Sequence, residues 1–199
     1  MYKNFFKRGI DIIASLVLLA LLSPLLIIVV LLIKMTSPGP VFFKQTRVGK
    51  GCKPFTLLKF RSMTNEKHEV KKYTGRDEGV TPIGYYLRKY KIDELPQLIH
   101  VLKGEMSLVG PRPSIPAHLE RMNEKELKRY NIRPGMTGLA QVSGNIHLDW
   151  KDRFTFDLEY LENISFLNDL RILKRTALLI IVGEEKFLNK PLKLQNADH

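Results

Sequence analysis

The sequence predicts an α/β protein that is mostly helical, with one short β-hairpin and a membrane helix at its N-terminus. An uncharged apolar run fills residues 12–33, two runs with strand-like alternation follow at 41–49 and 55–63, and apolar residues then recur at helical spacing. A chain of 199 residues suffices for one domain with a real core. We therefore expect a membrane anchor at 1–36, a folded domain at 37–183 and a tail at 184–199.

The N-terminal run is long enough to enter a membrane deeply. From Ile12 to Ile33 a straight helix would span roughly 33 Å, which matches the hydrocarbon core of a bilayer. A cleaved signal peptide fits poorly, because the run is too long and no small-x-small cleavage pattern follows it. Asp11 precedes the run, and we expect its carboxylate at the membrane interface beside Lys7 or Arg8.

The flanks and the middle of this run bear on whether it spans the membrane or turns back. Both flanks are basic, at residues 3–8 and 34–50, whereas the positive-inside rule expects one basic flank for a spanning helix. Pro24 cannot donate to the carbonyl of Ala20 and kinks the helix, and the Ser23 hydroxyl can partly satisfy the freed group. These residues alone leave a kinked spanning helix and a re-entrant helix equally open.

The segments VFFKQTRVG and FTLLKFRSM predict two strands joined by a turn around Lys50-Gly51. Lys59 and Arg61 alternate with apolar residues and would share one face of the second strand, for which a solvated face is the simplest interpretation. Residues 64–80 are charged and contain glycine, so a mobile loop is expected there.

Two helices are predicted next. Thr81 as N-cap and Pro82 at the first helical position begin one helix. The second begins at Asp93 and continues with apolar residues at positions 95, 98, 99 and 102, and Gly104 is its expected end.

The second half alternates ordered loops with helices. SLVGPRPSIP, residues 107–116, runs into a rigid loop with Arg112 between two prolines, and residues 117–130 are predicted to be helical and charged. NIRPGMTGLAQVSGN, residues 131–145, is rich in glycine and in turn residues, which favours an ordered functional loop.

Two further helices close the chain. The first starts near Trp150 and carries Arg153 and Asp157 as an i, i+4 pair. The last runs from Ser165 or Asn168 to Val182 and is apolar enough at its end to rest on a membrane, so amphipathic interfacial helices are part of the prediction.

Composition and motifs exclude several classes of protein. The formal net charge of +12 favours anionic partners such as nucleic acid, phosphorylated small molecules or an acidic membrane surface. Cys52 is the one cysteine, so no intrachain disulfide can form. The histidines lack metal-ligand spacing, which argues against zinc. GxSxG, GxGxxG and P-loop patterns do not occur, which argues against the corresponding hydrolases and nucleotide-binding folds.

The adjacent acids Asp93 and Glu94 in KIDELPQLIHVLKG admit two interpretations. The local pattern favours a helix start, because Asp is a good N-cap and Glu suits the first turn. Alternatively, an Asp carboxylate can attack phosphorus and a neighbouring Glu can hold Mg²⁺, with a helix N-terminus favouring the anion. Cations that could neutralise a phosphoryl group are Lys59, Arg61, Arg88, Arg112 and Arg133.

Six stretches together resemble the bacterial sugar transferases, also called monotopic phosphoglycosyl transferases. They are KRGIDIIAS with the later SP, SPGPVFFKQTRVG, KFRSM, IDELPQLIHVLKGEMSLVGPRP, RPGMTGLAQVSG and DLEYLENISFLNDLRIL. They occur in family order and cover the chain to about residue 182, and the DELPQL…KGEMSLVGPRP block is highly specific. Two positions depart from the family pattern: His100 stands where Asn is common, and Asn145 stands where Arg often follows the SG pair, which puts a donor contact in doubt.

The resemblance implies an enzyme that moves a sugar-1-phosphate from a UDP-sugar to a polyprenyl phosphate such as undecaprenyl phosphate, releases UMP, and so initiates glycoconjugate synthesis. It implies Asp93 as covalent nucleophile and Glu94 as its partner in binding Mg²⁺ or handling protons, with both carboxylates as the metal site. Lys59, Arg88 and Arg112 are the matching candidates for phosphate binding, with Arg133 as a further cation, and Asp157 is expected to organise the site.

The resemblance also implies a re-entrant helix broken at Ser23-Pro24, and hence a monotopic protein of the bacterial inner membrane with its active site facing the cytoplasm. The expected partners are the UDP-sugar, the polyprenyl phosphate and an anionic bilayer, without nucleic acid. A homodimer stays open, as do the donor sugar and the glycan that is made.

Two alternative functions remain at this stage. A membrane-anchored basic module that binds nucleic acid or anionic lipid would suit the charge, but no nucleic-acid motif is present and the DELPQL block would be unexplained. A glycosyl transferase that moves the whole sugar would release UDP instead of UMP.

Overall fold

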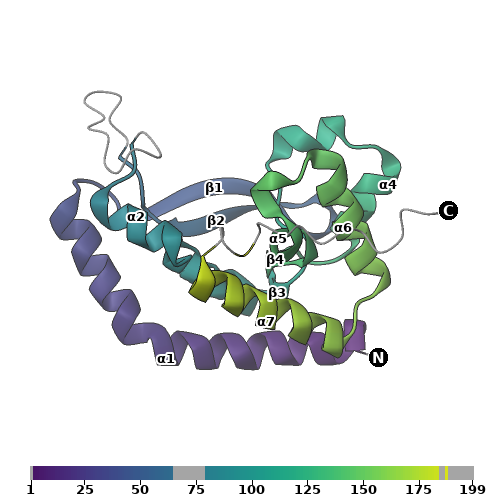
Figure 1. Ribbon diagram of the computed structural model, residues 1–199, viewed down its shortest axis with the longest axis horizontal. Coiled ribbons are helices and arrows are strands. Elements are labelled where there is room, and N and C mark those ends of the chain that lie inside the picture. Colours follow the sequence, from purple (N-terminus) through teal and green to yellow (C-terminus); the bar gives the residue numbers. More distant parts are fainter. Residues whose placement is uncertain (1, 65–78, 184–186, 188–199) are drawn as a thin grey trace.

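The computed structural model describes residues 2–64, 79–183 and 187, and it confirms the predicted α/β class: mostly helical, with a short hairpin (Figure 1). The helices are α1 (Lys7–Thr36), α2 (Pro82–Lys89), α3 (Leu98–Lys103), α4 (Glu124–Leu127), α5 (Leu139–Ser143), α6 (Trp150–Glu162) and α7 (Phe166–Val182). The strands are β1 (Phe42–Val48), β2 (Pro54–Phe60), β3 (Ser107–Val109) and β4 (Gly135–Thr137). The predicted loop at 64–80 and the tail at 184–199 lie almost entirely outside the described residues.

The predicted hairpin is confirmed, with a shorter second strand. β1 and β2 pair antiparallel from Phe42 opposite Phe60 to Val48 opposite Pro54. Arg61 therefore lies beyond the strand, and its expected place on one face with Lys59 is wrong. Its buried guanidinium donates to the carbonyls of Ser37 and Pro38 at 2.7 and 2.6 Å, because the chain leaving α1 exposes carbonyl groups there.

A second sheet was not foreseen. β3 pairs in parallel with β4, through Ser107 with Gly135 and Val109 with Thr137. Gly135 allows the close approach, since a Cβ at this position would lie 2.1 Å from the amide nitrogen of Gly110. The pairing brings the rigid loop that follows β3 against the glycine-rich loop that contains β4.

The predicted helix at 117–130 is divided into three short pieces. They are the 3-10 helices η4 (Pro116–Arg121) and η5 (Lys128–Asn131), with α4 between them. The first piece ends with Met122 as its C-cap, and Asn123 starts the second, because its side chain and that of Glu126 form a capping box.

Helix α1 is 30 residues long and remains helical through Ser23-Pro24. The Ser23 hydroxyl donates to the carbonyl of Ala20 at 2.8 Å, the group that Pro24 leaves without its helical donor, as predicted. Figure 1 shows α1 as two arms that meet at a bend, and the proline within the helix accounts for that bend. The break expected at this pair is thus a bend within one helix.

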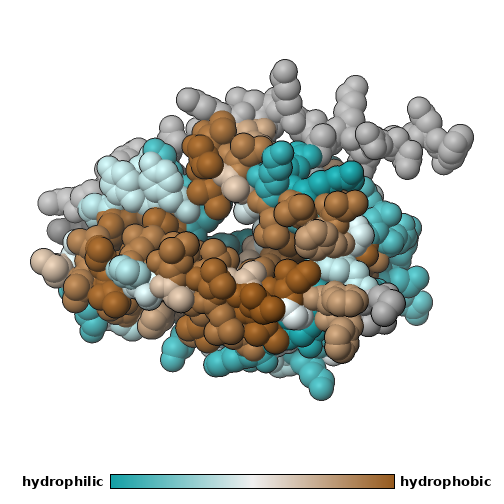
Figure 2. Space-filling model, turned by 90° about the horizontal axis from the view of Figure 1, so that it is seen from below, coloured by the Kyte–Doolittle hydropathy of each residue, from teal (hydrophilic) through white to brown (hydrophobic). Residues whose placement is uncertain are grey.

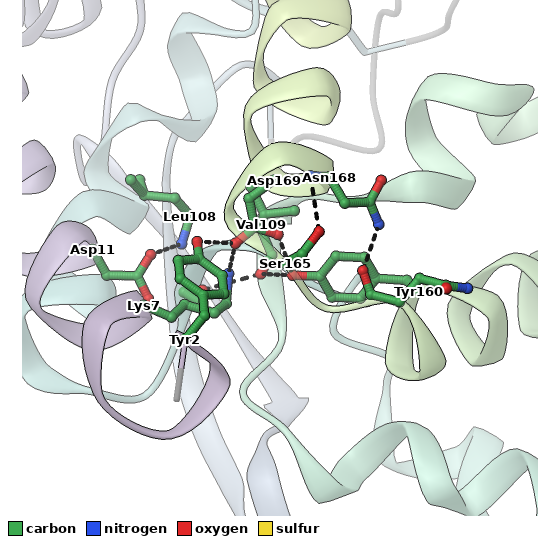
Figure 3. Close-up of polar contacts among 11 residues, drawn as sticks. Tyr2, Lys7, Asp11, Leu108, Val109, Tyr160, Ser165, Asn168 and Asp169 are labelled. Atoms are coloured by element: carbon green, nitrogen blue, oxygen red, sulfur yellow. Dashed lines mark hydrogen bonds and ion pairs between the residues drawn. The ribbon is translucent and has the colours of Figure 1, made fainter.

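The start of α1 is fastened to the rest of the protein by two buried carboxylates (Figure 3). Asp11 is only 4% exposed and accepts from the amide of Leu108 in β3 at 3.0 Å, so its carboxylate is buried within the protein near Arg8, and its place at a membrane interface stays a prediction. The carboxylate is buried because β3 presents an amide that needs an acceptor at this point. Asp169 of α7 takes the Lys7 ammonium at 2.5 Å and the hydroxyls of Tyr2 and Tyr160 at 2.6 and 2.7 Å.

An apolar face extends along α1 and α7. Figure 2, which views the molecule from below, shows hydrophobic surface across this side. Its exposed members include Ile13, Leu21, Ile27, Leu31 and Met35 on α1, and Leu167, Leu170, Leu178, Ile181 and Val182 on α7. Among the described residues, α1 alone is long and apolar enough to cross a membrane, and only 11% of its most apolar window is buried. A core helix of a water-soluble protein would be mostly buried, so this face favours contact with lipid.

Replacing Asp169 by Asn should lower the free energy of unfolding by about 3–5 kcal/mol, because the buried Lys7 ammonium would lose its counter-charge. Lys7→Met should have a similar effect. In the double variant the losses should be less than additive, measured by denaturant unfolding in detergent. Additivity within about 0.5 kcal/mol would show that the two groups are energetically independent.

Candidate active site

Asp93 and Glu94 lie in the first turn of a 3-10 helix, η3 (Ile92–Gln97), which leads directly into α3. Lys91 adopts the left-handed conformation, with φ of 54°, and turns the chain from α2 into η3. Neither acid is the N-cap, and no side chain caps this end. The predicted position at a helix start is therefore correct, but capping is not what these carboxylates do.

Glu94 is held by two cations from different parts of the chain. Its Oε1 accepts from the Lys59 ammonium of β2 at 2.5 Å and from the Arg112 guanidinium at 3.1 Å. Burial alone would raise the pKa of Glu94, but Arg112 and Lys59 together lower it to about 2. Glu94 is consequently a fixed negative charge at neutral pH.

Asp93 is buried beside this ion-paired group without a similar clamp. It is 7% exposed, and its Oδ1 has no hydrogen-bond partner within the described part of the chain. Burial and the neighbouring Glu94 raise its pKa, while Lys59, Lys91 and Arg88 act in the opposite direction. The result is a carboxylate oxygen with available lone pairs in a positive surrounding, which suits a nucleophile or a metal ligand.

Arg112 connects the carboxylates to a cavity of about 120 Å³. This arginine-lined cavity is bordered by Arg47, Arg112, Arg129 and Arg153, together with His118, Trp150 and Asp157. Aromatic rings form one wall, since the His118 and Trp150 ring centroids are 4.3 Å apart and Arg153 lies over Trp150 at 5.4 Å. Four guanidinium groups beside a flat indole suit an anionic ligand that also carries a planar ring.

Asp157 lines this cavity and pairs with an arginine that sequence reasoning missed. Asp157 forms an ion pair with Arg129 at 2.7 Å, and the Arg153 of the predicted i, i+4 pattern acts on it electrostatically. Arg129 also donates to the backbone carbonyl of Arg112 at 2.7 Å. The buried Asp157–Arg129 pair thus supports the segment whose side chain reaches Glu94. Asp157 and Arg129 are 28 positions apart, so no local pattern could have joined them.

The remaining candidates are distributed less closely. Arg88, in the last turn of α2, is exposed but near enough to act electrostatically on Asp93. Arg133 lies at the opposite end of α3, where its Nε donates to the carbonyl of Gly104 at 2.7 Å. Asn145, in the left-handed conformation, lines the arginine-lined cavity. His100 is buried, accepts from the amide of Leu58 at 3.1 Å and contacts Glu105 at 2.6 Å, so both of its ring nitrogens have partners within the fold.

Residues 2–183, almost the whole chain, match the family described as "Bacterial sugar transferase". The chain belongs to the bacterial sugar transferase family. It is 41% identical over 178 residues to a Bacillus subtilis protein named as an uncharacterized sugar transferase, EpsL, covering 89% of this chain and 88% of that protein.

Relatives of this sugar transferase carry more specific names. A UDP-glucose:undecaprenyl-phosphate glucose-1-phosphate transferase from Caulobacter vibrioides is 41% identical over 192 residues, covering 91% of this chain and 72% of the relative. An Aeromonas hydrophila UDP-N-acetylgalactosamine-undecaprenyl-phosphate N-acetylgalactosaminephosphotransferase is also 41% identical, over 187 residues, covering 90% of this chain and 44% of that protein.

The carboxylates of Asp93 and Glu94 fit a magnesium ion whose other coordination positions are filled by water and substrate. The described residues contain no cluster of three or more acidic, histidine or cysteine side chains, so they could not form an all-protein cage. Mg²⁺ commonly uses one or two carboxylates, water and substrate phosphates. The unpartnered Asp93 Oδ1 and the adjacent Glu94 meet that requirement, whereas Lys59 and Arg112 already occupy one oxygen of Glu94.

Burial raises the pKa of Asp157 from 3.8 to about 6, although Arg129 and Arg153 act to lower it. The folded transferase therefore binds this proton more tightly than the unfolded chain. The stabilising contribution is complete below pH about 4 and is lost as pH rises through about 6, amounting to at most about 3 kcal/mol.

Asp157→Asn should remove this pH dependence, because an amide does not titrate, and the variant should come closest to wild-type stability near pH 4, where Asp157 is protonated. Denaturant unfolding between pH 4 and 7 measures both effects. Asp149→Asn, at the exposed N-cap of α6, is the matched control and should keep the wild-type slope. An unchanged slope in Asp157→Asn would mean that another group titrates in this range.

Proposed function

We propose that this protein is a phosphoglycosyl transferase that moves a sugar-1-phosphate from a UDP-sugar to polyprenyl phosphate and releases UMP. The observation that carries the proposal is the buried Asp93, with an unpartnered Oδ1, beside the ion-paired Glu94. The names of the Caulobacter and Aeromonas relatives support the reaction class, since both describe the transfer of a phosphosugar to undecaprenyl phosphate.

In the first step, the Asp93 carboxylate attacks the phosphorus that carries the sugar. A bond forms between the carboxylate oxygen and this phosphorus, and the bond to the bridging oxygen of the diphosphate breaks. UMP leaves with the electron pair, and the phosphosugar remains on Asp93 as an acyl phosphate. Lys59 and Arg112 form ion pairs with Glu94, and Arg88 of α2 acts electrostatically to lower the pKa of Asp93. These three cations would surround the phosphoryl oxygens with positive charge during the transfer.

In the second step, a phosphate oxygen of the polyprenyl phosphate attacks the same phosphorus. The bond to Asp93 breaks, the carboxylate is regenerated, and a polyprenyl diphosphate sugar forms. Each step moves one phosphoryl bond and needs no oxidant or reductant. Asp93 and Glu94 are the residues that would hold Mg²⁺, which supplies charge neutralisation to the phosphates when bound.

The arginine-lined cavity is the proposed donor site. It adjoins Glu94 through Arg112 and holds guanidinium groups for the diphosphate. The exposed Trp150 ring offers a stacking surface for the base. With Asn145 in this lining, an amide occupies a place where the family often has a cation, so donor affinity depends more on Arg47, Arg129 and Arg153.

Helix α1 is proposed to enter the bilayer and return at its bend, which makes the protein monotopic in the inner membrane with Asp93 at the cytoplasmic face. Basic residues at both ends of α1 favour this arrangement. The kink at Ser23-Pro24 also favours it, because the Ser23 hydroxyl donates to the Ala20 carbonyl that Pro24 leaves without a donor. The acceptor's lipid tail can then remain in the membrane while its phosphate reaches the interface.

Incubation with a UDP-sugar alone should release UMP and add one phosphosugar to the protein, detected by intact-protein mass spectrometry. Asp93→Asn should abolish both signals, because an amide cannot form the acyl phosphate. Asp149→Asn, an exposed position that keeps its helix cap, should behave as wild type.

The same assay separates the alternatives. Release of UDP would identify transfer of the whole sugar, and normal turnover by Asp93→Asn would refute the covalent step. Chelation by EDTA should stop UMP release and added Mg²⁺ should restore it. Full activity in EDTA would remove Mg²⁺ from the proposal. A panel of UDP-sugars scored by UMP release then identifies the donor.

Cysteine labelling tests the re-entrant topology. Native Cys52 is exposed in the hairpin turn after α1, and Lys3→Cys in a Cys52→Ser background reports the segment before it. A membrane-impermeant maleimide applied to sealed inverted inner-membrane vesicles should label both positions from the cytoplasmic face. Labelling of the two positions from opposite faces would show that α1 spans the membrane.

A further inference from the structure

A second cavity, of about 350 Å³, lies where the first turn of α1 meets the folded domain. Its charged lining consists of Lys3, Lys7, Arg8, Lys50, Arg133 and Asp11. Within the described residues, it shares no lining side chain with the arginine-lined cavity, and neither Asp93 nor Glu94 borders it. We refer to it as the junction cavity.

Two guanidinium groups converge at one edge of the junction cavity. Arg8 donates to the carbonyls of Val101 and Leu102 at 2.5 and 2.9 Å, and Arg133 donates to the carbonyl of Gly104 at 2.7 Å. A Cβ at Gly104 would lie 3.3 Å from Nη2 of Arg8 and 3.9 Å from Nε of Arg133, so both groups meet at the end of α3.

These hydrogen bonds leave some N–H donors of Arg8 and Arg133 available. Each guanidinium has five N–H donors, and the carbonyl contacts use only some of them. The partial negative charge at the C-terminus of α3 offsets part of the repulsion between the two like charges. An anion in the cavity would offset the rest and could accept from the remaining donors.

The acids near the cavity do not balance its positive charge. Asp11 is committed to the amide of Leu108, and Asp169 is committed to Lys7 and two tyrosines. Lys3 and Lys50, from the start of the chain and the hairpin turn, face the cavity in addition to the arginines. The lining therefore combines a surplus of cations with the polar side chains of Asn131 and Ser107.

We propose that the junction cavity binds a phosphate group, independently of the catalytic site. A phosphate presents several oxygens to diverging donors, which suits two guanidinium forks and two ammonium groups. The volume also leaves room for a small group attached to the phosphate. The phosphate can come from an anionic phospholipid headgroup or from solution, since α1 begins at the cavity and continues into the apolar face.

Binding is measured on the full-length protein in detergent, with three probes at equal ionic strength: dihexanoyl-phosphatidylglycerol, dihexanoyl-phosphatidylcholine and inorganic phosphate. Saturable binding of phosphatidylglycerol, with little of phosphatidylcholine, identifies a headgroup. Saturable binding of inorganic phosphate alone identifies a soluble phosphate. Absence of saturable binding by phosphatidylglycerol and inorganic phosphate overturns the proposal.

Matched variants locate the site. Lys50→Gln and Asn131→Asp alter the lining, and each should weaken binding of the responsive probe about three- to tenfold. Lys53→Gln in the same hairpin turn and Asn123→Asp at the cap of α4 make the same chemical changes at exposed positions outside it. Equal effects of lining and control variants would reduce the binding to general surface charge and overturn the proposal.

UMP release by each variant is recorded in parallel. Since the junction cavity excludes Asp93 and Glu94, phosphate binding should persist in Asp93→Asn. Absence of UMP release by the wild-type protein, with intact phosphate binding, would count against the proposed function alone. Intact UMP release without phosphate binding would count against the junction cavity alone.

Discussion

The carboxylate of Asp169 is the interaction on which the arrangement of the molecule depends. It joins the start of α1 to α7 through Lys7 and Tyr2, and it also accepts the hydroxyl of Tyr160 from α6. That hydroxyl lies 3.2 Å from the carbonyl of Val109 as well, so β3 is included. A buried ion pair carries a large desolvation cost and is stable only when its remaining donors and acceptors are satisfied. Here the hydroxyls of Tyr2 and Tyr160 donate to the remaining lone pairs of Asp169. The start of the apolar helix α1 is thereby held in one position against the rest of the protein.

The polypeptide chain itself connects this junction to the pair of carboxylates, Asp93 and Glu94. β3 runs into the segment Pro111–Pro113, whose prolines limit the backbone around Arg112. The Asp157–Arg129 pair holds the Arg112 carbonyl, and the Arg112 side chain then reaches Glu94 together with Lys59. The two neighbouring acids thereby differ: the pKa of Glu94 falls to about 2, while burial raises that of Asp93. One carboxylate is fixed as a counter-ion and the other keeps an oxygen available.

Local patterns predicted those features whose causes are local. The Thr81 side chain accepts from the amide of Gly84, and the Ser23 hydroxyl compensates for Pro24, because both effects act within one helical turn. β3 and β4 are three residues each, too short for any periodicity, and Asp11 and Arg129 find partners far along the chain. For Asp93 the local pattern favoured a cap, and only the long DELPQL…KGEMSLVGPRP resemblance indicated chemistry. In η3 neither acid caps the helix, so the capping prediction is wrong, while the chemical role of Asp93 stays a prediction.

The position of α3 links the two anion sites that we propose. Its N-terminal end continues from η3, which carries Asp93, and its C-terminal carbonyls take Arg8 and Arg133. At 1.5 Å per residue, its six residues place these ends about 9 Å apart along the axis. Asp93 lies five residues before α3, so a lipid phosphate in the junction cavity would be separated from Asp93 by α3 together with part of η3. In the reaction that we propose, the acceptor phosphate would reach Asp93 from the same layer of headgroups. A rigid helix between the two sites would set the height of the nucleophile above the bilayer without requiring any conformational change.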